Sequence, residues 1–425
     1  MANVAKVAIL GCGARGAGYG KHMFSNPDKY KIVSICDINT KILDRYSKEW
    51  GVDSANLFTD ENEFLKEKRA DILVIGTQDR DHVRMCIKAL ELGYHILLEK
   101  PISPIKEELL ALLETHKKHP QNVVVCHVLR YAPAFVKIKE LLSSKAIGEL
   151  RLIEWTEQVA FWHQAHSFVR GNWRRDDQTS PMIMQKCCHD LDLLQYYVGD
   201  KCESVYSTGD LSFFKEEFQP EGAADNCYDC KYRNTCPYSA EYGYIERWHE
   251  KGDPKDLWPF NVCCSDVPLT EEKLREAYRT NQYGKCVFKC DNCVVDNQMV
   301  NMKFKNGVKV NLTMTGFTAV PGRKATFYGT LGEIRFDDFA DFIEVVEFGK
   351  TPVRYNISEL VDTDKAGYGH GGGDVIMVDS LYDMIYNKDS KVTTSLEASV
   401  ESHLMALCAE ESRKSGNVVK VHEEE

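Results

Sequence analysis

Apolar runs and amphipathic segments alternate along the first third of the chain. Short apolar runs lie at 4–10, 30–36, 71–76 and 95–98, and helix-length segments of mixed polarity separate them. Strands buried on both faces and joined through helices are typical of a parallel, doubly wound sheet. The run at 122–128 completes this layer, so we expect an α/β domain over residues 1–126.

From about residue 150 the pattern changes to alternating apolar and polar positions, which predicts a large, open, mostly antiparallel sheet. Asn306-Gly307 separates two such segments and indicates a hairpin. Helical patterns at 375–387 and 396–415 close the chain, the second stopped by Gly416. We expect a second α/β domain over 127–425. The stretch at about 218–293 fits neither pattern and is predicted to be an insertion.

Composition narrows the class of protein. The 425 residues are 43% hydrophobic and carry a net charge of −11, which is ordinary for a globular chain and argues against nucleic-acid binding. No apolar run is long enough to span a membrane. The first residues indicate a buried strand rather than a signal peptide, so we expect a cytoplasmic protein whose cysteines are free thiols or metal ligands.

A glycine-rich loop follows the first predicted strand and opens a helix. Gly11, Gly13 and Gly16 occur as G-x-G-x-x-G, which allows a tight turn, a close approach to a pyrophosphate and close helix packing. Asp37 ends the next strand, where a carboxylate accepts ribose hydroxyls and repels a 2′-phosphate. The loop therefore predicts a site for NAD rather than NADP; the alternative is a structural turn with Asp37 as a helix cap. The predicted cofactor residues are Gly11, Cys12, Gly13, Ala14, Arg15, Gly16 and Asp37.

The strand at 95–98 ends in Glu99-Lys100-Pro101. Polar residues at the carboxyl ends of parallel strands lie where ligands bind. Pro101 is expected to fix the loop, with a cis bond as one possibility, and to aim Lys100 into the cleft. An ammonium group there would hydrogen-bond a substrate hydroxyl, although the same three residues also occur in solvated turns.

In this order the motifs resemble the glucose–fructose oxidoreductase/inositol dehydrogenase family (Gfo/Idh/MocA). The segments that match are the glycine loop, Asp37-Ile38-Asn39, 75–82, Glu99-Lys100-Pro101, Arg130-Tyr131, 147–149 and 329–333. The resemblance implies an N-terminal Rossmann domain, a C-terminal domain whose sheet mediates contacts in a homo-oligomer (a dimer or tetramer), a bound nicotinamide and a sugar or cyclitol substrate. It further implies that Thr77, Asp79 and His82 belong to a loop that crosses the cofactor. Glu99 and Lys100 are then expected near the nicotinamide.

In that family an Asp four residues before a His commonly works with the Lys of the Glu-Lys-Pro motif. Here His189 is present, but Gln185 holds the Asp position. An imidazole can take a hydroxyl proton near neutral pH, whereas an amide can only hydrogen-bond. We expect Lys100 and His189 to be catalytic and Gln185 to contact substrate; the alternative for His189 is a buried core histidine. Three nearby residues are the alternatives for the role of the Asp that is replaced by Gln185, and they are Lys186, Asp190 and Asp192.

Two further polar segments are candidates for the substrate site. Aromatic rings and arginines suit the apolar and hydroxyl faces of a sugar ring. The expected contacts are His163, His166, Trp173, Arg174 and, in a glycine-rich loop, His370. The alternatives are a surface loop with packed tryptophans and a glycine-shaped turn capped by Asp374.

The predicted insertion carries Cys227-x-x-Cys230 followed by Cys236, and further cysteines at 263–293. Two thiolates at this spacing can bind one tetrahedral ion, and zinc would then fasten a loop that lacks its own core. An iron–sulfur cluster also uses four thiolates, and unligated thiols are the remaining alternative. The predicted metal ligands are Cys227, Cys230, Cys236 and, with Cys290 as the rival, Cys286.

The main hypothesis is an NAD-dependent oxidoreductase of carbohydrate metabolism, acting on a secondary alcohol of a sugar or cyclitol. One alternative is a glycosidase that keeps NAD bound and works by transient oxidation and elimination. Another is a non-catalytic NAD- or redox-sensing protein.

Overall fold

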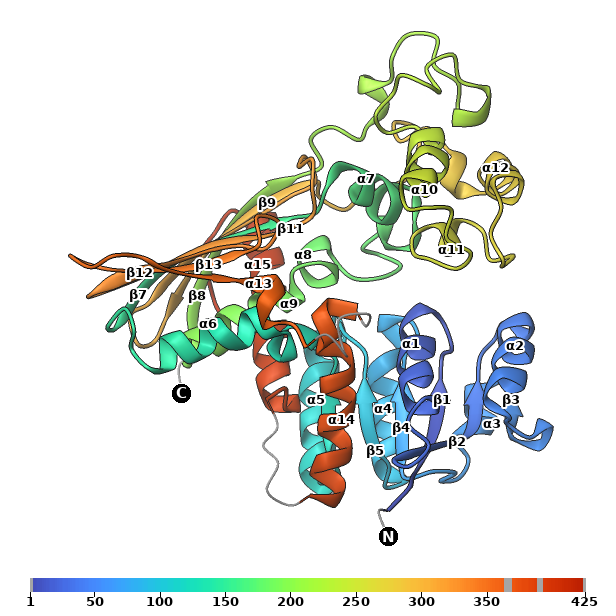
Figure 1. The fold of residues 1–425 in the computed structure, drawn as a ribbon, viewed down its shortest axis with the longest axis horizontal. Helices are drawn as coiled ribbons and strands as arrows, with labels where there is room; N and C mark the ends of the chain where they lie inside the picture. The colour runs from blue at the N-terminus through green and yellow to red at the C-terminus, as the bar shows by residue number, and fades with distance from the viewer. Residues whose placement is uncertain (1–2, 363–368, 388–392, 423–425) are drawn as a thin grey trace.

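Two β-sheets, each with its own helices, organise the chain, and a third group of short helices projects from the second sheet (Figure 1). The computed structural model describes residues 3–362, 369–387 and 393–422. Both sheets bury their apolar residues in one continuous core.

The first sheet contains six parallel strands in the order β3-β2-β1-β4-β5-β6. Their bounds are β1 Ala5–Leu10, β2 Tyr30–Cys36, β3 Leu57–Phe58, β4 Ile72–Ile75, β5 His95–Leu98 and β6 Val123–Val125. The helices between them are α1 Ala14–Phe24, α2 Thr40–Trp50, α3 Glu61–Phe64, α4 His82–Glu91 and α5 Lys106–Lys118. The strand order reverses between β1 and β4, because β2 and β3 lie on one side of β1 and β4, β5 and β6 lie on the other. In a sheet of this kind a crevice forms beyond the carboxyl ends of the two strands at the reversal. The predicted doubly wound domain is confirmed.

The second sheet contains nine strands in the order β14-β13-β12-β11-β7-β10-β9-β8-β15. Their bounds are β7 Leu150–Gln158, β8 Cys202–Asp210, β9 Asn297–Phe304, β10 Lys309–Thr315, β11 Gly322–Gly329, β12 Gly332–Asp337, β13 Phe342–Glu347, β14 Val353–Asn356 and β15 Val419–Lys420. Within this second sheet the described strands pair in antiparallel fashion except for β7 and β10, which are parallel, so the sheet is mostly antiparallel, as predicted.

One face of this sheet is covered and the other is open. Along β9 buried and exposed residues alternate strictly, which is the period of a strand with one face in a core. The covering helices are α6 Pro133–Ser143, α9 Cys188–Val198 and α15 Leu396–Ser415. Ser395 caps the start of α15. Gly416 ends this helix with a positive φ of 72°, and this is the stop that the sequence indicated.

Helix α14 (Gly373–Tyr386) belongs to the C-terminal half of the sequence but packs on the first sheet. It contacts α1, β5 and β6. Its Asp379 accepts hydrogen bonds from Lys29 and from the hydroxyl of Tyr30. The late helix therefore joins the two halves around the crevice.

The insertion between β8 and β9 holds the short helices α10 Arg247–Glu250, α11 Phe260–Cys263 and α12 Glu271–Thr280. The expectation that it lacks a core of its own is wrong. Tyr244, Trp248, Phe260 and Tyr278 are buried together there, because aromatic rings supply much apolar area per residue. An ion pair of 2.6 Å between Arg45 on α2 and Asp256 ties the insertion to the first domain.

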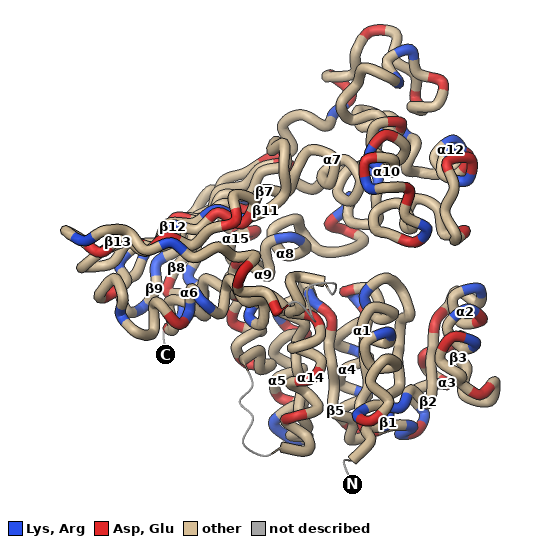
Figure 2. The backbone as a smooth tube through the Cα atoms, in the orientation of Figure 1, with Lys and Arg blue, Asp and Glu red and all other residues tan. Residues whose placement is uncertain are grey.

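Lys and Arg are interspersed with Asp and Glu over both halves in the view of Figure 2, with no broad basic face there. No helix in the described part of the chain is both long and apolar enough to cross a membrane.

Candidate active site

The glycine loop forms a cradle at the start of α1. Gly11 has a φ of +88°, and a Cβ there would lie 2.6 Å from the carbonyl oxygen of Gly76. A Cβ on Gly16 would lie 1.9 Å from the carbonyl oxygen of Gly11, so both positions require glycine. Gly13 differs: its φ is −67°, and a Cβ would meet nothing within 4 Å. The open space at Gly13, before a helix start with no side-chain cap, fits a pyrophosphate.

Asp37 lies at the carboxyl end of β2, beside this cradle. Its carboxylate accepts the N–H groups of Cys12 and Asn39, each at 2.8 Å. These bonds hold a negative charge where the ribose hydroxyls of a dinucleotide would bind. The next side chain, Ile38, is 85% exposed and leaves an apolar surface for a base. The residues present therefore fit an NAD cofactor.

The side chain of Arg15 turns away from the cradle toward two carboxylates. It pairs with Glu99 at 2.9 Å and with Asp374, at the start of α14, at 2.6 Å. Burial raises the pKa of Glu99, but the charges of Arg15 and Lys100 outweigh it and hold this pKa below its usual value. The guanidinium predicted to serve the cofactor thus links the glycine loop, the end of β5 and α14.

The loops after β4 and β5 are held together by His82. Its ring nitrogens lie 2.8 Å from the carbonyl oxygen of Pro101 and 3.1 Å from that of Thr77. The Thr77 hydroxyl donates to the sulfur of Met85 at 3.3 Å. The Lys100–Pro101 bond is cis, as the sequence allowed. His82 and Thr77 therefore shape these loops through contacts within the protein.

Lys100 meets the segment that precedes α9. Its Nζ donates to the backbone carbonyl of Gln185, the last residue of α8 (Met182–Gln185), at 3.2 Å. The Gln185 side chain in turn donates to the carboxylate of Asp79 at 2.6 Å. Ser180 donates to the same Asp79 oxygen, while the other oxygen is buried without a hydrogen-bond partner among the described residues. A carboxylate therefore stands beside position 185, supplied by another loop.

His189 lies in the first turn of α9 and is 9% exposed. Its Nδ1 is buried without a hydrogen bond among the described residues. The ring is 5.8 Å from that of His127 and 6.3 Å from that of His370. Burial, then the charge of Lys100, holds the pKa of His189 well below its usual value. The imidazole is therefore neutral and able to accept a proton.

The three residues left open for the missing role are engaged in buried pairs. Lys186 pairs with Glu157 at 3.0 Å, and Asp190 pairs with Arg323 at 2.7 Å. Asp192 pairs with Arg130 at 2.7 Å. Each of these three side chains is therefore held by an ion pair, whereas Asp79 contacts the side chain of Gln185 directly.

The substrate candidates divide into two groups. His163 lies close enough to Lys100 and Lys186 that, after burial, their charges lower its pKa, and its ring is 4.9 Å from Trp258 of the insertion. His166 bonds to the hydroxyl of Tyr244 at 2.7 Å. Arg174, in contrast, pairs with Asp291 at 2.7 Å, and Trp173 packs against the core. Within the part of the chain that the structure describes, neither Arg174 nor Trp173 contacts Lys100 through a hydrogen bond, ion pair or ring contact.

Two residues near the site escaped the sequence analysis. His127 lies two residues after β6, the last strand of the first sheet, and is fully buried beside His189. Trp258 reaches the site from the insertion, whose richness in tryptophan and tyrosine was the only signal. The four predicted metal ligands line a separate cavity within the insertion.

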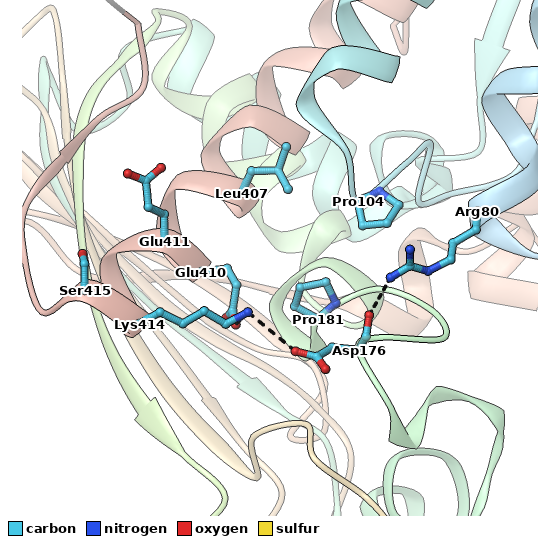
Figure 3. Close-up of a pocket in the computed structure, with 9 residues that line it drawn as sticks. All are labelled: Arg80, Pro104, Asp176, Pro181, Leu407, Glu410, Glu411, Lys414 and Ser415. Carbon is cyan, nitrogen blue, oxygen red and sulfur yellow. Dashed lines mark hydrogen bonds and ion pairs between the residues drawn. The ribbon is translucent and has the colours of Figure 1, made fainter.

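A cavity of about 610 Å³ lies behind this site, between Arg80, Pro181 and the end of α15 (Figure 3). Asp176 closes one side, where its carbonyl accepts from Arg80 and its carboxylate faces Lys414 at 3.7 Å. None of the predicted catalytic or cofactor residues lines it.

Comparison with known families matches both halves of the chain. Residues 5–127 match a family described as an oxidoreductase family with an NAD-binding Rossmann fold. Residues 139–421 match the C-terminal alpha/beta domain of the same oxidoreductase family.

Individual relatives are distant. YteT from Bacillus subtilis (strain 168) is 24% identical over 331 residues, which cover 76% of this chain and 74% of YteT. Inositol 2-dehydrogenase from Rubrobacter xylanophilus is 22% identical over 210 residues, covering 48% of this chain and 55% of the relative. A solved levoglucosan dehydrogenase, in complex with NADH and levoglucosan, aligns with a TM-score of 0.71 at 17% identity over 99% of this chain and all of that one. The structural likeness shows the shared fold.

Proposed function

Because the chain belongs to the Gfo/Idh/MocA family of NAD-binding oxidoreductases, we propose that it oxidises a secondary alcohol of a sugar or cyclitol. One observation carries the proposal: Lys100, His189 and the Asp79–Gln185 pair converge beyond the glycine cradle. NAD, when bound, supplies a hydride acceptor at nicotinamide C4. Side chains of this protein accept the proton, orient the substrate hydroxyl and position these groups.

His189 acts as the base. A neutral imidazole with an unbonded ring nitrogen can take the hydroxyl proton while hydride leaves the same carbon. Lys100 donates a hydrogen bond to the same hydroxyl and so orients it. The positive charge of Lys100 also favours the alkoxide character that develops as the proton leaves.

The Asp79–Gln185 pair acts as a positioning group. Asp79 is 2% exposed and holds the Gln185 amide by a short bond. The carbonyl of Gln185 in turn fixes the Lys100 ammonium. We infer that this chain of contacts replaces the carboxylate that relatives carry at position 185.

An aromatic wall completes the pocket. Trp162, His163 and Trp258 have ring centroids 4.9–5.8 Å apart. Flat apolar faces of this kind suit the C–H face of a pyranose or cyclitol ring, while the polar groups opposite suit its hydroxyls. The substrate class therefore follows from the chemistry of the wall and from the sugar and cyclitol substrates named for relatives.

The test is a panel of sugars, sugar acids and cyclitols incubated with enzyme and NAD, followed by NADH absorbance. Lys100→Met and His189→Asn should each lower kcat by about 100-fold or more while NADH binding persists. His249→Asn, on the exposed face of the insertion, is the matched control and should not change turnover. Full activity in both site variants would refute the assignment. Glycoside cleavage without net NADH would replace the dehydrogenase proposal by the redox-assisted glycosidase.

A further inference from the structure

Four cysteines that are far apart in the sequence converge around one small cavity. Cys227, Cys230, Cys236 and Cys286 line it together with Arg170. Cys227 opens a single 3-10 turn, and Cys230 and Cys236 follow on the next loop. Cys286 is brought to them by its N–H bond of 2.8 Å to Asp225 and by the pairing of Asn226 with Lys285. Cys290, the rival fourth ligand, does not line the cavity.

A buried positive charge lies at this cavity. Arg170 is 3% exposed, and its guanidinium donates to the carbonyls of Lys285 and Tyr238 and to the sulfur of Cys227 at 3.4 Å. No carboxylate pairs with Arg170 in the described part of the chain. A buried guanidinium needs a negative partner, and thiolates at the four cysteines would supply it. All sixteen cysteines are free of disulfides, so these thiols are available.

The spacing of the sulfurs decides between two occupants. A tetrahedral zinc ion with Zn–S bonds of about 2.3 Å brings its four sulfurs to about 3.8 Å from one another. Among these four cysteines, all of which the structure describes, no three sulfurs lie within 4.8 Å of one another. A four-iron cubane holds its cysteine sulfurs farther apart than a single tetrahedral ion does, because each thiolate binds a different iron. The spacing of these sulfurs exceeds that around a lone tetrahedral ion.

We propose that Cys227, Cys230, Cys236 and Cys286 ligate a [4Fe–4S] cluster. Apolar side chains, among them Pro220, Val287 and Phe288, complete the cavity wall and would shield the cluster from water. The guanidinium of Arg170 offsets part of the negative charge of the four thiolates.

The place of the cluster gives it a positioning role. Arg170 ends the π-helical segment Gln164–Arg170, which follows His163 directly. Through Arg170 the cluster holds the insertion against the segment that carries the aromatic wall. This role requires no electron transfer, and it is independent of the proposed substrate.

The test is anaerobic purification of the full chain from cells supplied with iron and cysteine, followed by iron, acid-labile sulfide and zinc analysis. The proposal predicts about four iron and four sulfide per chain, with visible charge-transfer absorption that bleaches with dithionite. Stoichiometric zinc without sulfide, iron without sulfide, or no metal would each overturn it.

Matched variants test the ligand set. Cys230→Ser and Cys286→Ser should lower the iron content by at least half, whereas Cys290→Ser should keep it. Iron that survives in Cys286→Ser but not in Cys290→Ser would overturn the assignment. NADH binding, measured on the same samples, reports whether the first domain is folded. A failure of the dehydrogenase proposal would leave the metal content unchanged, so the two proposals fail separately.

Discussion

Asp79 and Gln185 are 106 residues apart in the sequence, yet the Gln185 amide donates a hydrogen bond of 2.6 Å to the Asp79 carboxylate. The sequence shows the loss of an acid at position 185 and also shows an acid at position 79, but nothing in the spacing connects them. The connection is made by the fold, which brings the loop after β4 against α8. In the proposed mechanism, the acid that the sequence lacks at position 185 is supplied from another element.

This pairing predicts the outcome of an exchange. Gln185→Asp alone places two carboxylates in contact, so one is forced to protonate or move, and kcat/KM should fall by about tenfold or more. The double variant Asp79→Asn/Gln185→Asp restores one acid and one amide and should regain most of the activity. Steady-state kinetics on the natural chain, the single variants Asp79→Asn and Gln185→Asp, and the double variant measures the coupling. A double variant no better than Gln185→Asp would show that the pair is not a unit.

Asp37 should set the cofactor preference. Its carboxylate, fixed by two N–H bonds, lies where a 2′-phosphate would add like charge. Near a surface one such repulsion is worth about 1–4 kcal/mol, so Asp37→Ser should raise the ratio of kcat/KM for NADP over NAD by about tenfold or more. An unchanged ratio would contradict the placement of the ribose.

The role of a single residue was predictable from the sequence where the local backbone requires a particular residue type. Gly11 and Gly16 admit no side chain, and the Glu99-Lys100 pair ends a strand, so both motifs were found from the sequence. Arg15 and Arg174 were not, because a guanidinium can reach several partners. Arg15 pairs with Asp374 across 359 residues, and Arg174 with Asp291 in the insertion.

At the level of elements, the insertion brings the ring of Trp258 beside His163 and His166. Trp258 is 39% exposed and stands 4.9 Å from His163 and 5.5 Å from His166 between ring centroids. Its position suits a substrate face rather than a core.

Trp258→Ala should therefore raise KM for the sugar several-fold while the Kd for NADH stays unchanged, because the ring stacks on substrate only. Trp258→Phe should retain most of the affinity. The neighbouring Leu257, 41% exposed, is the matched control as Leu257→Ala. Equal effects of Trp258→Ala and Leu257→Ala would show that the ring has no specific role.

Periodicity predicted the elements themselves well. The alternation along β9 and β10 and the Asn306-Gly307 turn gave the hairpin, with Gly307 at a φ of +84°. Periodicity does not say which partner an apolar face will meet. For this reason α14 was expected with the second sheet but packs on the first, and the aromatic core of the insertion was missed.

At the scale of the whole molecule, several histidines are buried in the neutral form. Burial is the main reason why the pKa values of His127 and His189 lie well below the usual value. Burial is also the main reason why the pKa values of His166 and His403 fall to about 3. In the unfolded chain each titrates near 6.5. The unfolded state therefore binds more protons below that pH, and stability falls as the pH falls.

The melting temperature should accordingly drop as the pH is lowered from about 7.5 to about 5.5, a range above the titration of ordinary carboxylates. Differential scanning fluorimetry across this range measures it. His403→Gln should flatten the dependence, since one neutral buried imidazole is removed. A melting temperature that is constant or rises toward acid pH would contradict the buried neutral histidines.

The whole arrangement depends on a dinucleotide lying over Gly13 with its reactive ring toward Lys100 and His189. Calorimetric titration with NADH tests this most directly in the matched variants Gly13→Ala and Gly18→Ala. Neither added methyl group meets protein within 4 Å, so both should fold. The account predicts that NADH binds the natural chain and Gly18→Ala equally and binds Gly13→Ala about tenfold or more weaker, because only that methyl group enters the pyrophosphate space. Equal affinity in all three proteins, or no binding of NADH or NADPH by the natural chain, would contradict it.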